Sequence, residues 1–225
     1  MKLTIKRSKE ITGGIGFTTK TGFSYGLPAR TACNVGSKLS GQKGSACFGC
    51  YARGGNYAYP SVKQAHANRL TSVQKLNDSE ASSLWVQAMV TLILNVAKKH
   101  SRNMWFFRWH DSGDLVSVDH LRTIAEVARN TPEISHWLPT KEVNVVRDFL
   151  KTDSIPDNLT IRLSAYFIDK PADFNLDLPT AMVYKEKEAT GHECPAVQNH
   201  KGCLGNNCRL CWDSDIKTVC YKYHR

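Results

Sequence analysis

The sequence predicts an α/β fold, in which a parallel β-sheet is flanked by helices and is either open or closed into a partial (β/α) barrel. Strand-like and helix-like segments alternate through the middle of the chain, a pattern typical of β-α-β units with right-handed crossovers. A cysteine-rich N-terminal loop precedes this region, and a cysteine-rich C-terminal segment follows it. The prediction therefore places a β/α core between two cysteine-bearing ends.

The first 60 residues are predicted to be mostly irregular. We expect an opening strand at residues 2–7, after which glycines interrupt any long regular element, since eleven of the 15 glycines precede residue 60. A loop of about thirty residues without structure of its own is unusual in a compact domain. Because this loop carries Cys33, Cys47 and Cys50, we expect it to wrap around a cofactor.

The elements of the core follow from hydrophobic periodicity. Apolar residues at helical spacing predict helices at residues 61–76 and 79–100, and Leu84, Met89 and Ile93 belong to the buried stripe of the second. The remaining chain alternates between β-rich and amphipathic segments. It predicts helices at 118–129 and 143–151 and strands at 104–109, 134–138, 159–165, 181–184 and 218–223.

The length and composition allow one substantial core. With 225 residues, of which 41% are hydrophobic, we expect a single α/β domain spanning 1–225. We divide it into a glycine-rich, basic cysteine loop region (1–60), a β/α core (61–190) and a cysteine-rich C-terminal segment (191–225). The chain has no uninterrupted run of about 18 apolar residues, so we expect no membrane span.

Positive charge is concentrated in the N-terminal third. The formal net charge is +10, and residues 1–70 contain eleven Lys and Arg but a single acid, Glu10. The rest of the chain balances 19 basic against 19 acidic residues. Such a basic region attracts polyanions, so nucleic acid is a candidate partner.

The eight cysteines indicate two thiolate metal sites. Thiolate is the soft ligand that favours zinc, copper(I) or iron–sulfur clusters. The alternative is a disulfide framework, but such frameworks belong to small secreted domains, and no apolar signal segment follows Met1. The candidate ligands are Cys33, Cys47 and Cys50 in the first group and Cys194, Cys203, Cys208 and Cys211 in the second.

Polar side chains follow three of the predicted strands. In parallel α/β folds the chemistry gathers at the carboxyl ends of the strands, so these residues are predicted to line one pocket. The alternative is that Ser112, Asp114 and Thr140 merely cap the helices that follow. The candidates are His110, Ser112, Gly113 and Asp114 after the first strand, Thr140, Lys141 and Glu142 after the second, and Arg162 and Ser164 in the third.

The histidines outside these strand ends are weaker candidates. We expect structural or solvated roles for His66, His100, His120, His136 and His224. His192 and His200 differ, because they flank cysteines of the second group and are alternative ligands of a mixed zinc site.

Several motifs in order along the chain resemble the phage "gene product 88" domain family. This resemblance implies a bacteriophage or prophage origin and a bacterial host cytoplasm, and it supplies no reaction. The motifs are Ala46-Cys47-Phe48-Gly49-Cys50-Tyr51-Ala52, Phe107-Arg108-Trp109-His110-Asp111-Ser112-Gly113-Asp114-Leu115, Trp137-Leu138-Pro139-Thr140-Lys141-Glu142, Asn158-Leu159-Thr160-Ile161-Arg162-Leu163-Ser164-Ala165, Cys194-Pro195-Ala196 and Cys208-Arg209-Leu210-Cys211-Trp212.

A more distant resemblance concerns the layout of the chain. A three-cysteine loop before parallel β/α units, with Ser112-Gly113-Asp114 at a strand end, is similar to radical S-adenosylmethionine enzymes. It implies a 4Fe–4S cluster on the three cysteines, with one iron open to the methionine moiety of S-adenosylmethionine. The spacing Cys33-x13-Cys47-x2-Cys50 is longer than the C-x3-C-x2-C of that family.

This second resemblance also implies roles for the strand-end residues. Ser112 and Asp114 would take the amino group of the cofactor, and Lys141 and Glu142 its carboxylate or ribose. Arg162 or Ser164 would contact substrate. His110, Asp114 and Lys141 are the catalytic candidates.

For the second cysteine group, the spacing fits either a further 4Fe–4S cluster or a structural zinc. Cys220 is then spare, is an alternative ligand, or completes the first site if the chain ends meet. Our leading hypothesis is an iron–sulfur protein that reductively activates a bound cofactor. The rival is a non-enzymatic zinc or iron–sulfur module that contacts nucleic acid or a host protein through its basic N-terminal third.

Overall fold

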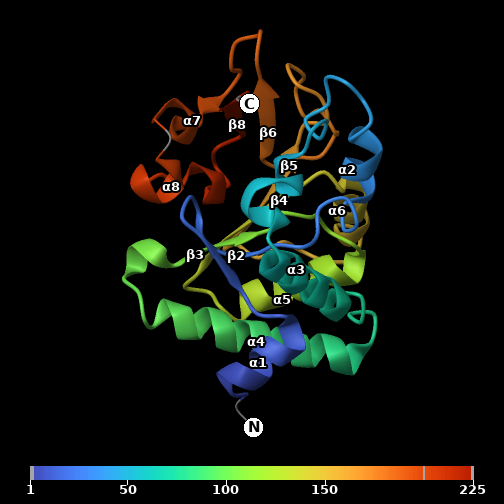
Figure 1. The fold of residues 1–225 in the computed structure, drawn as a ribbon, viewed down its shortest axis with the longest axis vertical. Helices are drawn as coiled ribbons and strands as arrows, with labels where there is room; N and C mark the ends of the chain where they lie inside the picture. Colours follow the sequence, from blue (N-terminus) through green and yellow to red (C-terminus); the bar gives the residue numbers. More distant parts are fainter. Residues whose placement is uncertain (1–2, 200, 224–225) are drawn as a thin grey trace.

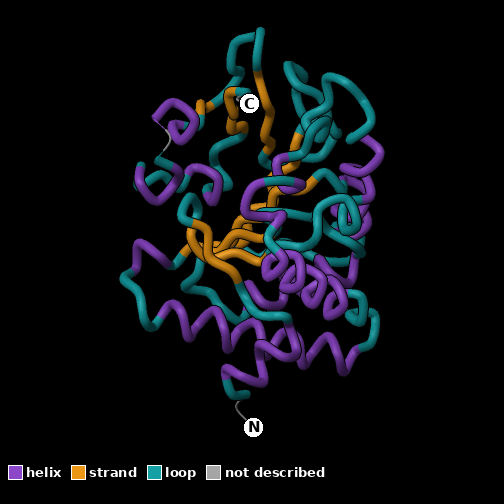
Figure 2. The backbone as a smooth tube through the Cα atoms, viewed as in Figure 1, coloured by secondary structure: helices purple, strands orange, loops and turns teal. Residues whose placement is uncertain are grey.

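The computed structural model of this chain describes residues 3–199 and 201–223 and shows one mixed, mostly parallel sheet (Figure 1). The strands lie in the order β1-β2-β3-β4-β5-β6-β8-β7, and only the β1–β2 hairpin is antiparallel. Figure 2 shows them as one twisted band. The strands are β1 (Gly16–Thr18), β2 (Gly22–Tyr25), β3 (Phe106–Trp109), β4 (Ser135–Thr140), β5 (Leu159–Ser164), β6 (Thr180–Tyr184), β7 (His192–Glu193) and β8 (Thr218–Lys222).

The predicted parallel sheet is thus confirmed, and a closed barrel is not formed, because β1 and β7 are the two ends of the strand order. From β2 to β6 each strand pairs with the next one along the chain, so the carboxyl ends of five parallel strands meet at one edge. We call this the carboxyl edge of the sheet.

Helices cover one face of the sheet. Contacts run from α1 to α4, from α4 to α5 and from α5 to α6, and these helices bury the main apolar core with Phe107, Leu138 and Ile161 from the strands. The helices are α1 (Ile5–Thr12), α2 (Asn34–Leu39), α3 (Pro60–Val73), α4 (Ser79–Ala97), α5 (Val118–Arg129) and α6 (Val143–Phe149).

The C-terminal cysteine segment covers the other face. Trp137 of β4 points away from the helices and packs with Cys203, Cys211 and Trp212, because neighbouring strand residues face opposite sides. Figure 1 shows this red segment across the sheet from α1 and α4. It contains α7 (Pro195–Asn199), α8 (Gly202–Gly205) and the 3-10 turn η4 (Leu210–Trp212).

The N-terminal region differs most from its prediction. The expected strand at residues 2–7 is wrong, because Thr4 caps a helix there by accepting a hydrogen bond from the Arg7 N–H, and Gly13 ends that helix with φ 77°. The glycine-rich stretch is also more ordered than expected. It holds the β1–β2 hairpin, α2 and two 3-10 turns, η1 (Tyr51–Arg53) and η2 (Gly55–Ala58).

Helix α4 has the length and mean hydropathy, 1.2, of a membrane span. In the structure it lies between α1 and α5, and Trp85, Met89, Leu92 and Ile93 are buried in the protein core. Packing of this kind accounts for the apolar character of the helix without a membrane.

His136 is buried at the centre of the main core and is fully hydrogen-bonded. The Trp109 indole N–H donates to His136 Nδ1 at 3.2 Å, and His136 Nε2 lies 2.9 Å from Thr131 Oγ1. Since Nδ1 accepts, we infer that the proton of the neutral ring is on Nε2. Burial lowers the pKa of His136 to about 3.

This arrangement predicts acid sensitivity. The unfolded chain binds a proton at His136 below about pH 6.5, whereas the folded chain does so only near pH 3, so stability falls as the pH decreases between these values. The slope from this group is about 1.4 kcal/mol per pH unit. We expect His136→Asn to reduce the slope of unfolding free energy against pH by that amount, measured by urea denaturation from pH 6 to 4.5. Substitution of the exposed His100 by Asn is the control, and an equal reduction there would contradict the prediction.

Candidate functional site

The loop that carries the first cysteine group, residues 26–50, lies over the carboxyl edge of the sheet. It is attached there by hydrogen bonds to the exit of β3. The Leu27 N–H donates to Ser112 O at 2.7 Å, and the Ser112 hydroxyl donates back to Leu27 O at 2.8 Å. The Asp114 N–H donates to Ala32 O at 2.8 Å, directly before Cys33.

The Asp114 carboxylate joins the exits of β3 and β4. Its Oδ1 accepts hydrogen bonds from the Thr140 hydroxyl at 2.5 Å and the Leu115 N–H at 2.8 Å, and Oδ2 accepts from the Lys141 N–H at 2.9 Å. The Asp114 carboxyl is buried, and burial raises its pKa. The three hydrogen bonds act in the opposite direction and lower it. The interpretation of Ser112 and Asp114 as caps of α5 is wrong, because Ser117 caps that helix.

The exits of β4 and β5 hold the rest of the loop. Glu142 Oε1 accepts from the Val35 N–H at 2.8 Å, at the start of α2. The Ala46 N–H donates to Tyr166 O at 2.9 Å, and the Tyr166 hydroxyl donates to Lys141 O at 3.1 Å. The exits of β3, β4 and β5 therefore all hold the loop, and its two ends are held at different strands.

These attachments bring the three cysteines together. Burial raises the pKa of Cys33 to about 12, and negative charge on Asp114, Cys50 and Cys47 acts in the same direction. A Cβ at Gly36 would lie 3.5 Å from Cys47 Sγ and 3.8 Å from Cys33 Sγ. The bare glycine thus leaves a space that two sulfurs face.

Lys141 supplies positive charge at this place. Burial raises the pKa of Cys47, and the Lys141 ammonium opposes that effect more strongly than any other charged neighbour. Asp114 and Glu142 also act on Cys47, in the raising direction. Of the predicted strand-end residues, these three lie within electrostatic range of the first cysteine group.

Three other predicted residues lie elsewhere. His110 is buried with its ring centroid 5.3 Å from that of His120 in α5, and neither ring has a hydrogen-bond partner among the described residues. Arg162 is fully buried and donates to the carbonyls of Thr180, Ile216, Leu210 and Asp213. Ser164 is half-buried at the end of β5. The guanidinium that was predicted to contact substrate instead holds the C-terminal segment.

The second cysteine group converges on the opposite face of the sheet from the helices. Burial raises the pKa of Cys203 to about 11, with Cys194 and Cys208 next in effect. Burial likewise raises that of Cys211 to about 12, and the Cys211 thiol lies 3.1 Å from the Tyr221 hydroxyl. Cys203 thus lies within electrostatic range of the other three predicted ligands.

Backbone contacts fix the loops that carry this second group. The Cys203 N–H donates to Lys20 O at 2.7 Å, so α8 lies against the tip of the β1–β2 hairpin (Figure 1). Arg209 donates to the carbonyls of Cys203 and Cys208, and its guanidinium lies over Phe106 at 4.6 Å.

Cys220 lies on the opposite face of β8 from the second group. It is fully buried with Ala165, Met182 and Tyr184, whereas the next residue, Tyr221, packs with Cys203 and Cys211. This placement argues against Cys220 as a ligand of the second site, and its completion of the first site stays a prediction. His192 is exposed in β7, and His200 and His224 lie outside the described residues.

None of the eight cysteines forms a disulfide, and among residues 3–199 and 201–223 no three His, Cys, Asp or Glu side chains stand at metal-binding distance. The thiols of each group are near one another without forming, among the described residues, a donor set at coordination distance. As residue types, thiols are the ligands that suit a thiophilic metal or cluster.

A polar cluster that the sequence analysis did not single out lies between the two groups. The Tyr51 hydroxyl donates to Asp111 O at 2.6 Å, and the Tyr57 hydroxyl donates to Asp111 Oδ2 at 3.1 Å. Arg108 acts electrostatically on Tyr51 and also on Cys203 of the second group. The placement of Tyr51 directly after Cys50 is the sequence signal that points to this cluster.

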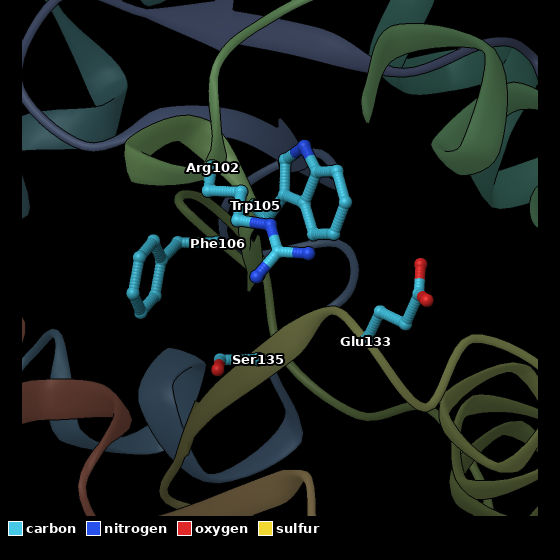
Figure 3. A pocket seen from close by; sticks show the side chains of 5 residues that line it. All are labelled: Arg102, Trp105, Phe106, Glu133 and Ser135. Atoms are coloured by element: carbon cyan, nitrogen blue, oxygen red, sulfur yellow. The ribbon is translucent and has the colours of Figure 1, made fainter. Parts of the chain in front are cut away.

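A hollow lies at the opposite edge of the sheet, where β3 and β4 begin. It has a volume of about 410 Å³. Figure 3 shows the Arg102 guanidinium beside the Trp105 and Phe106 rings, with Glu133 and Ser135 across from them. None of the predicted site residues lines it, so it is distinct from the candidate site.

The close contact at Gly113 gives a test of how the cysteine loop is held. Gly113 has φ 77°, and a Cβ there would lie 2.5 Å from Leu27 Cβ. We expect Gly113→Ala to lower the free energy of unfolding by about 2–4 kcal/mol, through backbone strain and overpacking. Urea denaturation measures this, with Gly41→Ala as the control, since no atom lies within 4 Å of a Cβ at Gly41. Equal effects of the two substitutions would show that Leu27 does not pack on this turn.

Comparison with known proteins gives one match. No curated protein and no solved structure matches the chain. The family model described as "Gene product 88" matches residues 2–214. These residues include the cysteine loop, the strand exits that hold it and all four cysteines of the second group. The chain therefore belongs to the phage gene product 88 family.

Proposed function

We propose that this protein is an iron–sulfur protein whose first site, Cys33, Cys47 and Cys50, holds a 4Fe–4S cluster at the carboxyl edge of the sheet. The observation that carries the proposal is that Cys33 and Cys47 lie beside the space at Gly36, with Cys50 and Lys141 within electrostatic range of Cys47. The proposed location is the cytoplasm of the phage host, where thiols stay reduced.

The number and surroundings of the donors favour a cluster over a closed zinc site. Three thiolates leave one metal position for an outside ligand, whereas a structural zinc takes four protein ligands. Burial raises the pKa of the Cys33 and Cys47 thiols, so loading would release protons from them, and the Lys141 ammonium would compensate part of the thiolate charge.

When bound, such a cluster would supply one electron to a ligand on its open iron, as in the radical S-adenosylmethionine enzymes that the chain layout resembles. The residues of this chain would bind and orient that ligand. The Lys141 ammonium is placed to pair with a carboxylate of the ligand, and Asp114 is placed to accept from its amino group. Asp114 and Glu142 also keep the loop in position, so their side chains serve structure and binding together.

The second site is proposed to hold either another 4Fe–4S cluster or a zinc ion. Its ligands would be Cys194, Cys203, Cys208 and Cys211, which is a complete tetrathiolate set. Arg162 and Arg209 bind the carbonyls around these cysteines, so the site would join the C-terminal segment to the sheet. The proposed role of this second site is therefore structural.

A non-enzymatic metal module is the second candidate, favoured by the internal hydrogen bonds that Asp114 and Glu142 already make. The two candidates differ in whether a small ligand reaches the first site.

Metal analysis of anaerobically purified protein tests the proposal. We expect about four to eight irons per chain with matching sulfide, and a change in the absorbance and paramagnetic-resonance spectra when S-adenosylmethionine is added. Iron and sulfide without that spectral change would support the non-enzymatic module. Zinc without sulfide would overturn the iron–sulfur proposal.

Cysteine variants test whether the two sites are independent. We expect Cys50→Ala to remove the first cluster and leave the metal content of the second site unchanged. Cys220→Ala, at the buried cysteine on the other face of the sheet, is the matched control and should keep both sites. Loss of both sites from Cys50→Ala in a folded protein would be evidence against separate sites. Asp114→Asn keeps a side-chain oxygen as acceptor and the backbone N–H bond to Ala32, so it should retain both sites and weaken the spectral response to S-adenosylmethionine.

A further inference from the structure

We propose that the outer surface of the first cysteine loop binds a single-stranded polynucleotide, whose bases stack on exposed aromatic rings. We call this surface the aromatic face and define it by Phe48, Tyr51, Tyr59 and Phe167. The proposal goes beyond the metal chemistry and does not depend on which metal the cysteines hold.

Exposed aromatic side chains are concentrated at this place. Six large apolar side chains are exposed in the described part of the chain. Four of them form the aromatic face, with exposed fractions of 39% for Phe48, 65% for Tyr51, 59% for Tyr59 and 37% for Phe167. A cluster of exposed rings next to a candidate site is typical of a binding surface.

The backbone keeps these rings close together. Residues 45–59 run through successive tight turns, in which the Phe48 N–H donates to Ser45 O and the Gly54 N–H to Tyr51 O. The isolated β-bridge between Ser45 and Phe167 brings the fourth ring to the same loop. The four residues therefore belong to one loop, residues 45–59, and to the segment bridged to its start.

Two contacts also hold the Tyr51 ring in place. Its hydroxyl donates to Asp111 O at 2.6 Å, and its ring centroid lies 5.7 Å from that of Tyr57. The ring is thus fixed by its hydroxyl end while its outer surface is open to solvent. A base that stacks on it would order no further side chain, which lowers the entropic cost of binding.

The charge around the aromatic face is positive. No acidic residue occurs between Glu10 and Asp78, and the exposed basic residues of this stretch include Arg30, Lys43, Arg53 and Lys63. Asp169, two residues beyond Phe167, directs its carboxylate to the N–H groups of residues 185–187. The ligand that this surface complements is an anion.

A single-stranded polynucleotide combines the two features that the surface recognises. Its phosphates match the exposed Lys and Arg, and its unpaired bases offer flat rings for stacking on Tyr and Phe. A base-paired duplex keeps its bases covered, and an acidic peptide supplies charge without a series of flat rings. Exposed rings and positive charge occur together here, and this favours a single-stranded polynucleotide over a duplex or an acidic peptide.

Fluorescence anisotropy with a labelled 15-mer of deoxythymidine tests the proposal on the full chain. We expect binding at low salt that weakens as salt increases, and about a tenfold higher Kd for Tyr59→Ala, since one stacked base is lost. Tyr59 has an exposed side chain, so the variant should fold. Phe17→Ala is the matched control, because Phe17 is 53% exposed but lies on β1, outside the aromatic face.

A second pair of variants tests whether positive charge on the protein contributes to polynucleotide binding. Arg53→Gln should reduce the slope of log K against log salt by about 0.7, the value for one single-strand phosphate contact. Lys99→Gln, at an exposed position after α4, should leave it unchanged. Absence of binding at 50 mM salt would overturn the proposal. A second outcome would also overturn it: a polyglutamate competitor displaces the 15-mer at equal charge concentration, and Tyr59→Ala has no effect on the Kd. Recognition would then be by charge alone, as for an acidic protein partner.

Discussion

The buried Asp114 carboxylate is the interaction on which the arrangement of the carboxyl edge depends. It accepts hydrogen bonds from Thr140, Lys141 and Leu115, so it fixes the exits of β3 and β4 relative to each other. The same residue donates its N–H to Ala32 O, next to Cys33. One residue therefore links two strands through its side chain and the first cysteine loop through its backbone N–H. An unpaired carboxylate at this depth would be costly, so the network holds as a unit.

The two cysteine groups differ in how the fold presents them. The first lies on a loop at the carboxyl edge, next to exposed rings and positive charge, where a ligand can approach. The second is packed against the face of the sheet by Arg162, Arg209 and the tryptophans of β4 and η4. A redox or binding role suits the first position, and a structural role suits the second. Arg108, which acts on both Tyr51 and Cys203, lies between them.

Several strand-end residues have more than one possible use. Ser112, Asp114 and Glu142 hold the cysteine loop by hydrogen bonds that need no ligand. Lys141 is different, because its backbone takes part in the network while its ammonium acts electrostatically on Cys47.

The sequence by itself determined the α/β class, the helix at 118–129, most of the core strands and the cysteine sets as candidate ligands. These follow from local periodicity and residue type, which a single chain displays directly. It did not predict α1, because the Thr4 cap and the packing of α1 on α4 outweigh the strand-like composition of residues 2–7. Only the tertiary structure decided that Cys220 faces away from the second group, that Arg162 binds carbonyls and that His110 packs on His120. Those outcomes depend on which face of a strand a side chain occupies and on partners far along the chain, and no local pattern encodes either.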